Sequence, residues 1–314
     1  MTAFTSPVSQ SQIQGTLGQA FALLGPEVDQ ALTNRLNVVE AGMLVPLGVV
    51  SNTGSTTVRK RWATGFGYAT PMTAVAETGA VEASGFEASY DDVTVARYGI
   101  AAGSSFMREI FGNDGLGVRE MAATHADSYM ATLRSLLFSS FTSMANSAGT
   151  SGAVLDLDDI FALIALYEAI PGFSGSVINL LAPKQLKELR AALRAYAGLQ
   201  FEDPTERLQG LSGTSFKFNF LGMSFYLAHG LSTASGDLVG ASYAANKFGF
   251  VAGNTSAVPV EGAADVSVLP DWGLITVGKI DGAQAQMRVD TSAFIGVGAA
   301  SDSLIPGYRI LSAA

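Results

Sequence analysis

The sequence contains no cysteine and only two histidines among its 314 residues. Without cysteine the chain has neither a disulfide framework nor a thiolate metal site. His125 and His229 leave little capacity for acid–base chemistry near neutral pH, because histidine is the side chain that titrates there. His125 falls in the apolar stripe of a long expected helix and His229 at the end of an aromatic strand. We therefore interpret both as structural.

Signatures of catalysis are also missing. The chain has no G-x-S-x-G elbow, no H-E-x-x-H pair and no P-loop. "GVGAAS" at 296–301 resembles a dinucleotide-binding turn, but Pro306 and Gly307 follow where its helix should continue. "DLDD" at 156–159 resembles the start of a calcium loop, yet Phe161 occupies the position that needs glycine, and helix capping is the better account. We expect no enzyme, no cofactor and no metal site.

Charge is scarce as well. Only 14% of the residues are charged, against about 25% in ordinary soluble domains, and mean hydropathy is +0.30. No stretch approaches the ~20 apolar residues that span a bilayer, and "MTAFTSPVSQSQIQG" at the start is no secretory signal. Other protein chains, rather than a membrane, are therefore expected to cover the surplus apolar surface. A net charge of -9 argues against a protein that grips phosphate backbones.

A long two-stranded excursion is predicted between residues 51 and 103. "TTVRKRW" at 56–62 and "VTVARYGI" at 93–100 are rich in β-branched and aromatic residues, which favours strands. The returning arm, "VAETGAVEASGFEASYDDVTV" at 75–95, carries five carboxylates and no basic residue. An isolated hairpin is only marginally stable in water, so this one needs a surface to lie on.

A long helix follows, in "GNDGLGVREMAATHADSYMATLRSLLFSSFTSM", with Asp114 as its expected cap. About 30 residues at ~1.5 Å each give roughly 45 Å. "NSAGTSG" then marks a boundary. The apolar residues recur every three or four positions, which predicts one buried face: Val118, Met121, Ala122, His125, Tyr129, Leu133, Leu136, Leu137, Phe141 and Met144.

Residues 154–231 alternate between helix and strand, which predicts an α/β domain. Asp156 is the expected cap of the first helix, with Asp159 completing a capping box. Pro183 opens the second helix and Gly198 ends it, and the strands "TSFKFNF" and "MSFYLAHGL" turn near Gly222. The tail from about 256 is strand-rich, as in "GLITVGKI" and "AFIGVG". The expected inward residues are Ile160, Phe161, Ile164, Tyr167 and Ile170 in the first helix and Leu186, Leu189, Leu193 and Tyr196 in the second.

This order of parts resembles the major capsid proteins of tailed bacteriophages, whose Hong Kong 97-like capsid fold is shared with encapsulins and herpesvirus shells. Three stretches carry the resemblance: "AVAETGAVEASGFEASYDDVTVARYGIAAGSSFMREIF", "SVINLLAPKQLKELRAAL" and "FLGMSFYLAHGL". It implies an α+β fold in five segments. These are an N-terminal arm (1–50), an E-loop (51–103), a peripheral domain with a spine helix (104–150), an axial domain (151–255) and a β-rich return to the peripheral domain (256–314).

The resemblance also implies a function. Hexamers and pentamers of the chain would tile an icosahedral shell, assembled in the host cytoplasm, that encloses double-stranded DNA without binding it specifically. Implied partners are the chain itself, a portal and a decoration protein. Because the chain starts shortly before the excursion, where some relatives carry a fused scaffolding segment, a separate scaffolding protein is expected. The only lysine in 51–103, Lys60, lies on a strand, so no lysine–asparagine cross-link between subunits is expected.

Charges on the excursion suggest how copies meet. Basic residues on the outgoing strand and acidic residues on the return would face each other between subunits, and repetition of such pairs selects register and partner. The hypothetical subunit-interface residues are Arg59, Lys60, Arg61, Glu77, Glu82, Phe86, Glu87, Tyr90, Asp91 and Asp92.

Two other classes stay open. An encapsulin shares the fold but encloses cargo enzymes, and the genes beside this one would separate the two. An enzyme or a secreted β-rich surface protein would form a small oligomer rather than a shell.

Overall fold

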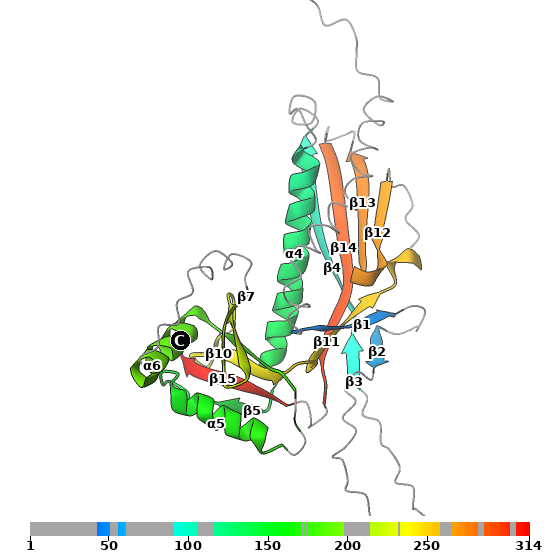
Figure 1. The fold of residues 1–314 in the computed structure, drawn as a ribbon. Helices are drawn as coiled ribbons and strands as arrows, with labels where there is room; N and C mark the ends of the chain where they lie inside the picture. Colours follow the sequence, from blue (N-terminus) through cyan, green and yellow to red (C-terminus); the bar gives the residue numbers. More distant parts are fainter. Residues whose placement is uncertain are drawn as a thin grey trace, which may run out of the picture.

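In the part of the chain that the structure describes, one long helix joins two large β-sheets, and a third, two-stranded sheet lies beside the first (Figure 1). The computed structural model describes residues 43–50, 56–60, 91–105, 116–142, 144–170, 173, 175–197, 214–231, 233–257, 265–281, 286–301 and 306–314. Helix α4 (Leu116–Phe141) runs along the first sheet and reaches the second with its C-terminal end. In this described part of the chain, no helix is long and apolar enough to cross a bilayer.

The first sheet has six strands and supports the base of the expected excursion. Its order is β1 (Val45–Val50), β11 (Phe248–Gly253), β14 (Gln286–Ala299), β13 (Leu274–Asp281) and β12 (Asp265–Leu269), and β4 (Ala96–Ser105) pairs with β14. All pairs among these strands are antiparallel except β1 with β11. The strands expected in "GLITVGKI" and "AFIGVG" are confirmed as parts of β13 and β14.

Helix α4 confirms the predicted spine. Its 26 residues give a length of about 39 Å. Asp114 and the side chains of Val118 and Ala122 lie outside the described residues. The other stripe residues are buried apart from Leu136, which is partly buried. Three more side chains, Ala126, Met130 and Phe138, are buried as well. The buried face is wider than one stripe because the helix packs into a core to which both sheets contribute.

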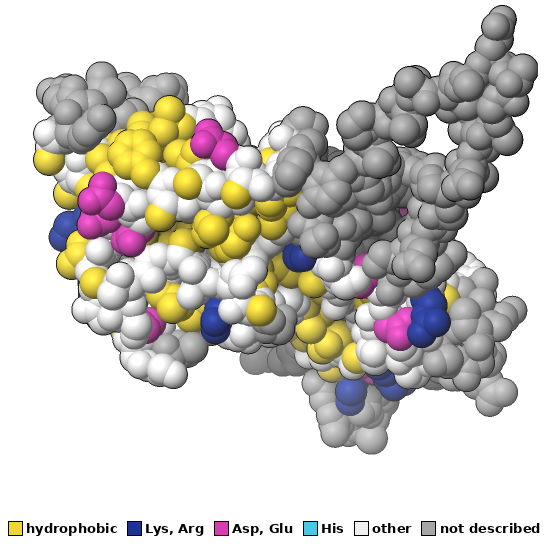
Figure 2. Space-filling model, turned by 90° about the horizontal axis from the view of Figure 1, so that it is seen from below, with side chains coloured by type: hydrophobic (Ala, Val, Ile, Leu, Met, Phe, Trp, Pro, Cys, Tyr) yellow, Lys and Arg dark blue, Asp and Glu magenta, His cyan; other side chains and the backbone are white. Residues whose placement is uncertain are grey.

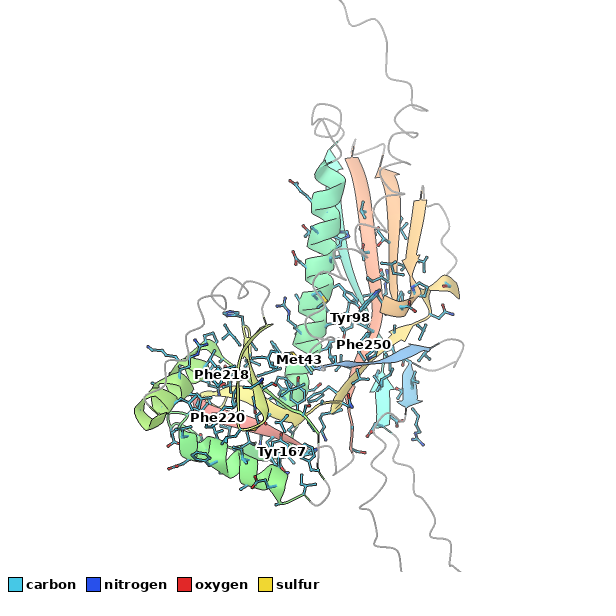
Figure 3. All side chains as sticks on the ribbon, viewed as in Figure 1. Met43, Tyr98, Tyr167, Phe218, Phe220 and Phe250 are labelled. Atoms are coloured by element: carbon cyan, nitrogen blue, oxygen red, sulfur yellow. The ribbon has the colours of Figure 1, made fainter. Side chains whose placement is uncertain are left out.

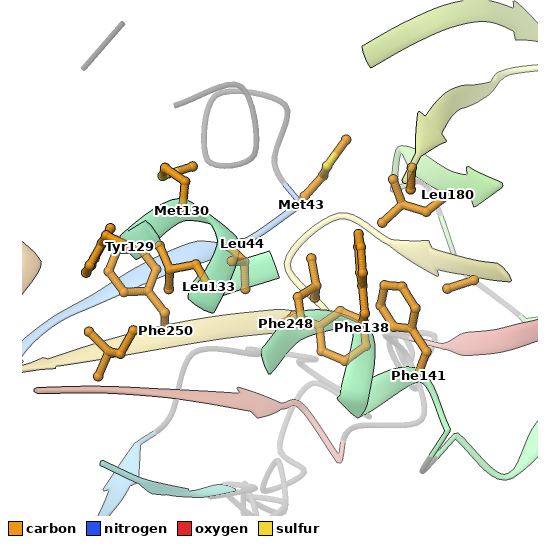
Figure 4. Packing of buried hydrophobic residues seen from close by; sticks show 14 of the residues in the cluster. Met43, Leu44, Tyr129, Met130, Leu133, Phe138, Phe141, Leu180, Phe248 and Phe250 are labelled. Carbon is orange, nitrogen blue, oxygen red and sulfur yellow. The ribbon is translucent and has the colours of Figure 1, made fainter. Parts of the chain in front are cut away.

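Aromatic rings at the end of α4 join the two sheets (Figure 4). The ring of Phe141 lies 5.6 Å from that of Phe138, 5.9 Å from that of Tyr243 and 5.6 Å from that of Phe248. Tyr243 belongs to β10 (Asp237–Ala244) of the second sheet, and Phe248 to β11 of the first. The four rings are buried and form one continuous core, so the two sheets act as one body.

The second sheet has seven strands and includes strands predicted for residues 154–231. Its order is β5 (Asn146–Ala148), β15 (Gly307–Ala313), β10, β6 (Val177–Leu181), β8 (Met223–Ala228) and β7 (Thr214–Phe220), with β9 (Thr233–Ala234) paired to β10. Strands β6 and β8 are parallel neighbours, and helix α6 (Pro183–Ala197) lies between them in sequence. Positive φ angles at Leu221 (48°) and Gly222 (78°) make the predicted turn between β7 and β8.

Helix α5 (Leu157–Glu168) begins with the predicted capping box. The Asp159 N–H donates to the Asp156 carboxylate at 3.0 Å, and the Asp156 N–H donates to the Asp159 carboxylate at 3.2 Å. The predicted buried face of this helix is wrong at one residue: Phe161 is exposed, and Leu163 is buried instead. At 100° per residue, position 163 shares a face with 160 and 167, whereas 161 turns outward.

Helix α6 begins at Pro183 as predicted, with Leu186, Leu189 and Leu193 buried. The side chain of Tyr196 and residue Gly198 lie outside the described residues. Both helices cover a second core that includes Tyr167 and Phe218, with Phe220 partly buried against it (Figure 3).

Each of the two large sheets contains strands from both sides of a segment boundary that the sequence predicted, at residue 150 or 255. Strand β11, before 255, lies in the first sheet, and β5, before 150, lies in the second. Within the tail, β12 to β14 return to the first sheet, but β15 does not. It pairs with β10 and buries Tyr308 and Ile310 in the second core.

The two histidines lie in different environments. His125 is buried on the inner face of α4, where its Nδ1 lies 2.7 Å from the Thr291 hydroxyl, which in turn lies 3.1 Å from the Thr276 hydroxyl. Burial lowers the pKa of His125, and the negative charge of Asp290 opposes that shift in part. His229 is exposed just beyond β8. The structural interpretation of His125 therefore agrees with its place in the core.

The buried His125 predicts a specific loss of stability in acid. Its folded pKa lies below the unfolded value of about 6.5, so the unfolded chain binds the proton more tightly. The stabilisation is complete above about pH 6.5 and is lost as the pH falls towards the folded pKa. His125→Gln keeps a hydrogen-bonding group beside Thr291 but does not titrate. Between pH 7 and 5, the free energy of unfolding should fall more steeply for the wild type than for this variant, by at most about 1.4 kcal/mol per pH unit. Equal slopes in chemical denaturation would contradict a buried neutral histidine.

Candidate assembly site at the base of the hairpin

The base of the predicted excursion is a two-stranded hairpin. Strand β2 (Thr57–Lys60) pairs antiparallel with β3 (Asp91–Thr94), with Thr57 opposite Thr94 and Lys60 opposite Asp91. The outgoing and returning strands therefore start and end side by side, as the sequence predicted. The part between them, residues 61–90, lies outside the described residues.

One ion pair crosses this hairpin. The Arg59 guanidinium donates to both carboxylate oxygens of Asp92, at 2.9 and 3.3 Å. The hydrogen bond lowers the pKa of Asp92 and raises that of Arg59. Both side chains are exposed, so water and salt screen the pair. Its main effect is to favour one register of the two strands.

Three contacts anchor the hairpin base to the first sheet. The Asp91 carboxylate accepts a hydrogen bond from the Ser301 N–H at 2.9 Å, just beyond the end of β14. Val93 is buried, and its side chain lies near Gly296 of β14. Gly296 also lets the Thr94 carbonyl approach so closely that a Cβ atom there would collide with it. The base of the hairpin is therefore held against the first sheet by contacts within its own chain.

The structure places only part of the hypothetical interface. Arg59, Asp91 and Asp92 lie together at the hairpin base, and Lys60 lies in β2 with its side chain outside the described residues. Within one chain Arg59 and Asp92 pair with each other, whereas the sequence suggested partners on a neighbouring copy. Their role between copies stays a prediction. The other six residues lie outside the described part: Arg61, Glu77, Glu82, Phe86, Glu87 and Tyr90.

Sequence reasoning missed the anchor on β14. The stretch "GVGAAS" resembles a dinucleotide turn, but in the fold its first glycine receives the hairpin and its serine N–H binds Asp91. The glycine-rich strand end was the one available signal, since glycine within a strand often marks a close backbone approach. Among the described residues, no group of His, Asp and Glu side chains could hold a metal ion.

Solved structures share this arrangement of elements. Comparison of the sequence with protein-family models and with curated proteins finds no match. The capsid of Ralstonia phage GP4 is similar to this chain with a TM-score of 0.53 and 10% identity, over 86% of each chain. The chain has the Hong Kong 97-like capsid fold.

Two further structures are similar at lower TM-scores. The capsid of cyanophage P-SCSP1u has a TM-score of 0.49 and 11% identity, over 86% of each chain. A virus-like particle from Pyrococcus furiosus has a TM-score of 0.49 and 12% identity, over 92% of this chain and 98% of its own.

The close approach at Gly296 predicts that a single methyl group undocks the hairpin. Gly296→Ala should destabilise the fold by about 1–3 kcal/mol, the usual cost of overpacking, because the collision is with backbone. Limited proteolysis should then cut faster within residues 51–103. Gly99→Ala is the matched control, since a Cβ there meets the Thr291 carbonyl at an ordinary 3.7 Å. Equal cleavage of both variants and the wild type would show that β14 does not hold the hairpin.

Proposed function

We propose that this chain is the major capsid protein of a tailed bacteriophage, forming hexamers and pentamers that build an icosahedral shell around double-stranded DNA. The observation that carries the proposal is the fold shared with the Ralstonia phage GP4 capsid over most of both chains. The anchored hairpin base supports it, because a base held against the first sheet starts the excursion from the same place on every copy.

The net charge of the chain fits a shell that encloses DNA without binding it. With a net charge of -9, the chain lacks the surplus of Lys and Arg with which proteins hold phosphate backbones. DNA would therefore be enclosed rather than bound. In this proposal the shell assembles in the host cytoplasm with a separate scaffolding protein and a portal, and a decoration protein completes the virion.

Electron microscopy of the expressed chain tests the proposal. Closed shells of uniform size are expected, and small oligomers alone would contradict it. The molecules found inside the shells distinguish a phage capsid from an encapsulin. An encapsulin would hold cargo enzymes, whereas a phage capsid assembled with its packaging proteins would hold nuclease-protected DNA.

Charge reversal tests whether the hairpin base takes part in assembly. Arg59→Glu, Lys60→Glu and Arg61→Glu together should lower the yield of shells at least about tenfold, because like charges would face each other between copies. Sedimentation measures the yield, and circular dichroism checks that the subunit folds. Unchanged assembly would remove the proposed role.

A charge swap tests whether Arg59 meets acids other than Asp92. Arg59→Asp with Asp92→Arg restores an ion pair between positions 59 and 92, both within one chain and between identical copies. If Arg59 instead meets Glu77, Glu82 or Glu87 of a neighbouring copy, the swap should assemble as poorly as Arg59→Asp alone. Full recovery of shells would show that a pair between positions 59 and 92 is sufficient.

A further inference from the structure

Helix α5 is apolar on two faces. One face is buried in the second core through Leu157, Ile160, Leu163 and Tyr167. A helix at the surface normally has a polar opposite face, and a helix that is apolar all round is normally buried. The outer face of α5 consists instead of Phe161, Ala162, Ala165 and Leu166, and all four are exposed.

This apolar surface continues beyond the helix. The Phe161 ring lies 6.4 Å from that of Phe220, at the end of β7. Next to Phe220, Leu221 is 59% exposed at a turn position with positive φ, where asparagine or glycine is usual. Leu221 therefore adds exposed apolar area that the turn itself does not require. Figure 2 looks from the side on which α5 lies and shows hydrophobic side chains gathered over this part of the molecule.

Helix α6 offers a surface of complementary character. Among its exposed residues, Lys184, Lys187, Ala191 and Ala195 lie along one side of the helix. The two alanines leave room for large apolar side chains. Lys184 also donates hydrogen bonds to the carbonyls of Ala313 and Ala314, at 3.0 and 2.9 Å.

Charges decide how two such surfaces would meet. Exposed acids, Asp158 and Glu168, stand at the two ends of α5. An antiparallel symmetric contact between two α5 helices would bring Asp158 of one near Glu168 of the other, which disfavours it. The lysines of α6 offer the opposite sign.

We propose that the outer face of α5 (Phe161, Ala162, Ala165 and Leu166) docks on the exposed side of α6 (Lys184, Lys187, Ala191 and Ala195) of a second copy of this chain. The inference rests on the proposed function, in which copies surround one another. Because the two surfaces differ, the contact is heterologous, and repeating it generates a ring when the rotation closes.

The absence of cysteine makes the contact directly testable. The double variant Leu166→Cys with Ala191→Cys carries one thiol on each surface. A short bis-maleimide should link assembled copies into a ladder on a denaturing gel, because each copy has both reactive surfaces. Leu166→Cys alone should give no dimer. Ala131→Cys with Ala191→Cys is the matched control, since Ala131 is exposed on α4, and it should give no ladder.

Each contrary result overturns the contact. Dimers from Leu166→Cys alone would show a symmetric α5 contact, and shells without a ladder would show that other surfaces join the copies. Cross-links to a different protein would show that this protein, and not a second copy of the chain, binds the outer face of α5. The same reaction in concentrated solution tests the contact when no shells form. A ladder without shells would therefore refute the proposed function but not the contact.

Discussion

The packing of α4 against both sheets is the interaction on which the rest of the structure depends. Phe141 lies among rings from α4, β10 and β11, so one buried cluster joins elements far apart in sequence. Close-packed interiors transmit strain and resist deformation. The hairpin base on the first sheet and the helices α5 and α6 on the second therefore keep a fixed relation. The proposed shell would need such a relation between the surfaces through which its copies meet.

The low fraction of charged residues and the exposed apolar side chains also favour contacts between copies of the chain. Only 14% of the residues are charged, and large apolar side chains such as Leu166 and Leu221 are exposed on the described surface. Soluble monomers rarely keep large apolar patches uncovered. Contacts between copies would cover this apolar surface. The exposed ion pair of Arg59 and Asp92 at the hairpin base favours one register of β2 and β3 but adds little to the stability of the fold.

Local patterns in the sequence predicted the elements better than their contacts. The α4 stripe and the Asp156 capping box follow from helical spacing and side-chain chemistry, and both are present. The prediction that Phe161 is buried was wrong, because it followed the size and hydrophobicity of the side chain and not its angular position on the helix. The bond from the Ser301 N–H to Asp91 joins residues 210 positions apart, and no local pattern encodes such a pairing. The six interface residues outside the described part remain predictions from charge alone.

The mass of the purified chain in concentrated solution tests the central claim most directly. Sedimentation velocity should show species far larger than the 32.5 kDa monomer, because in the proposed shell copies cover one another's apolar surfaces. A stable monomer that stays soluble at high concentration would contradict the account.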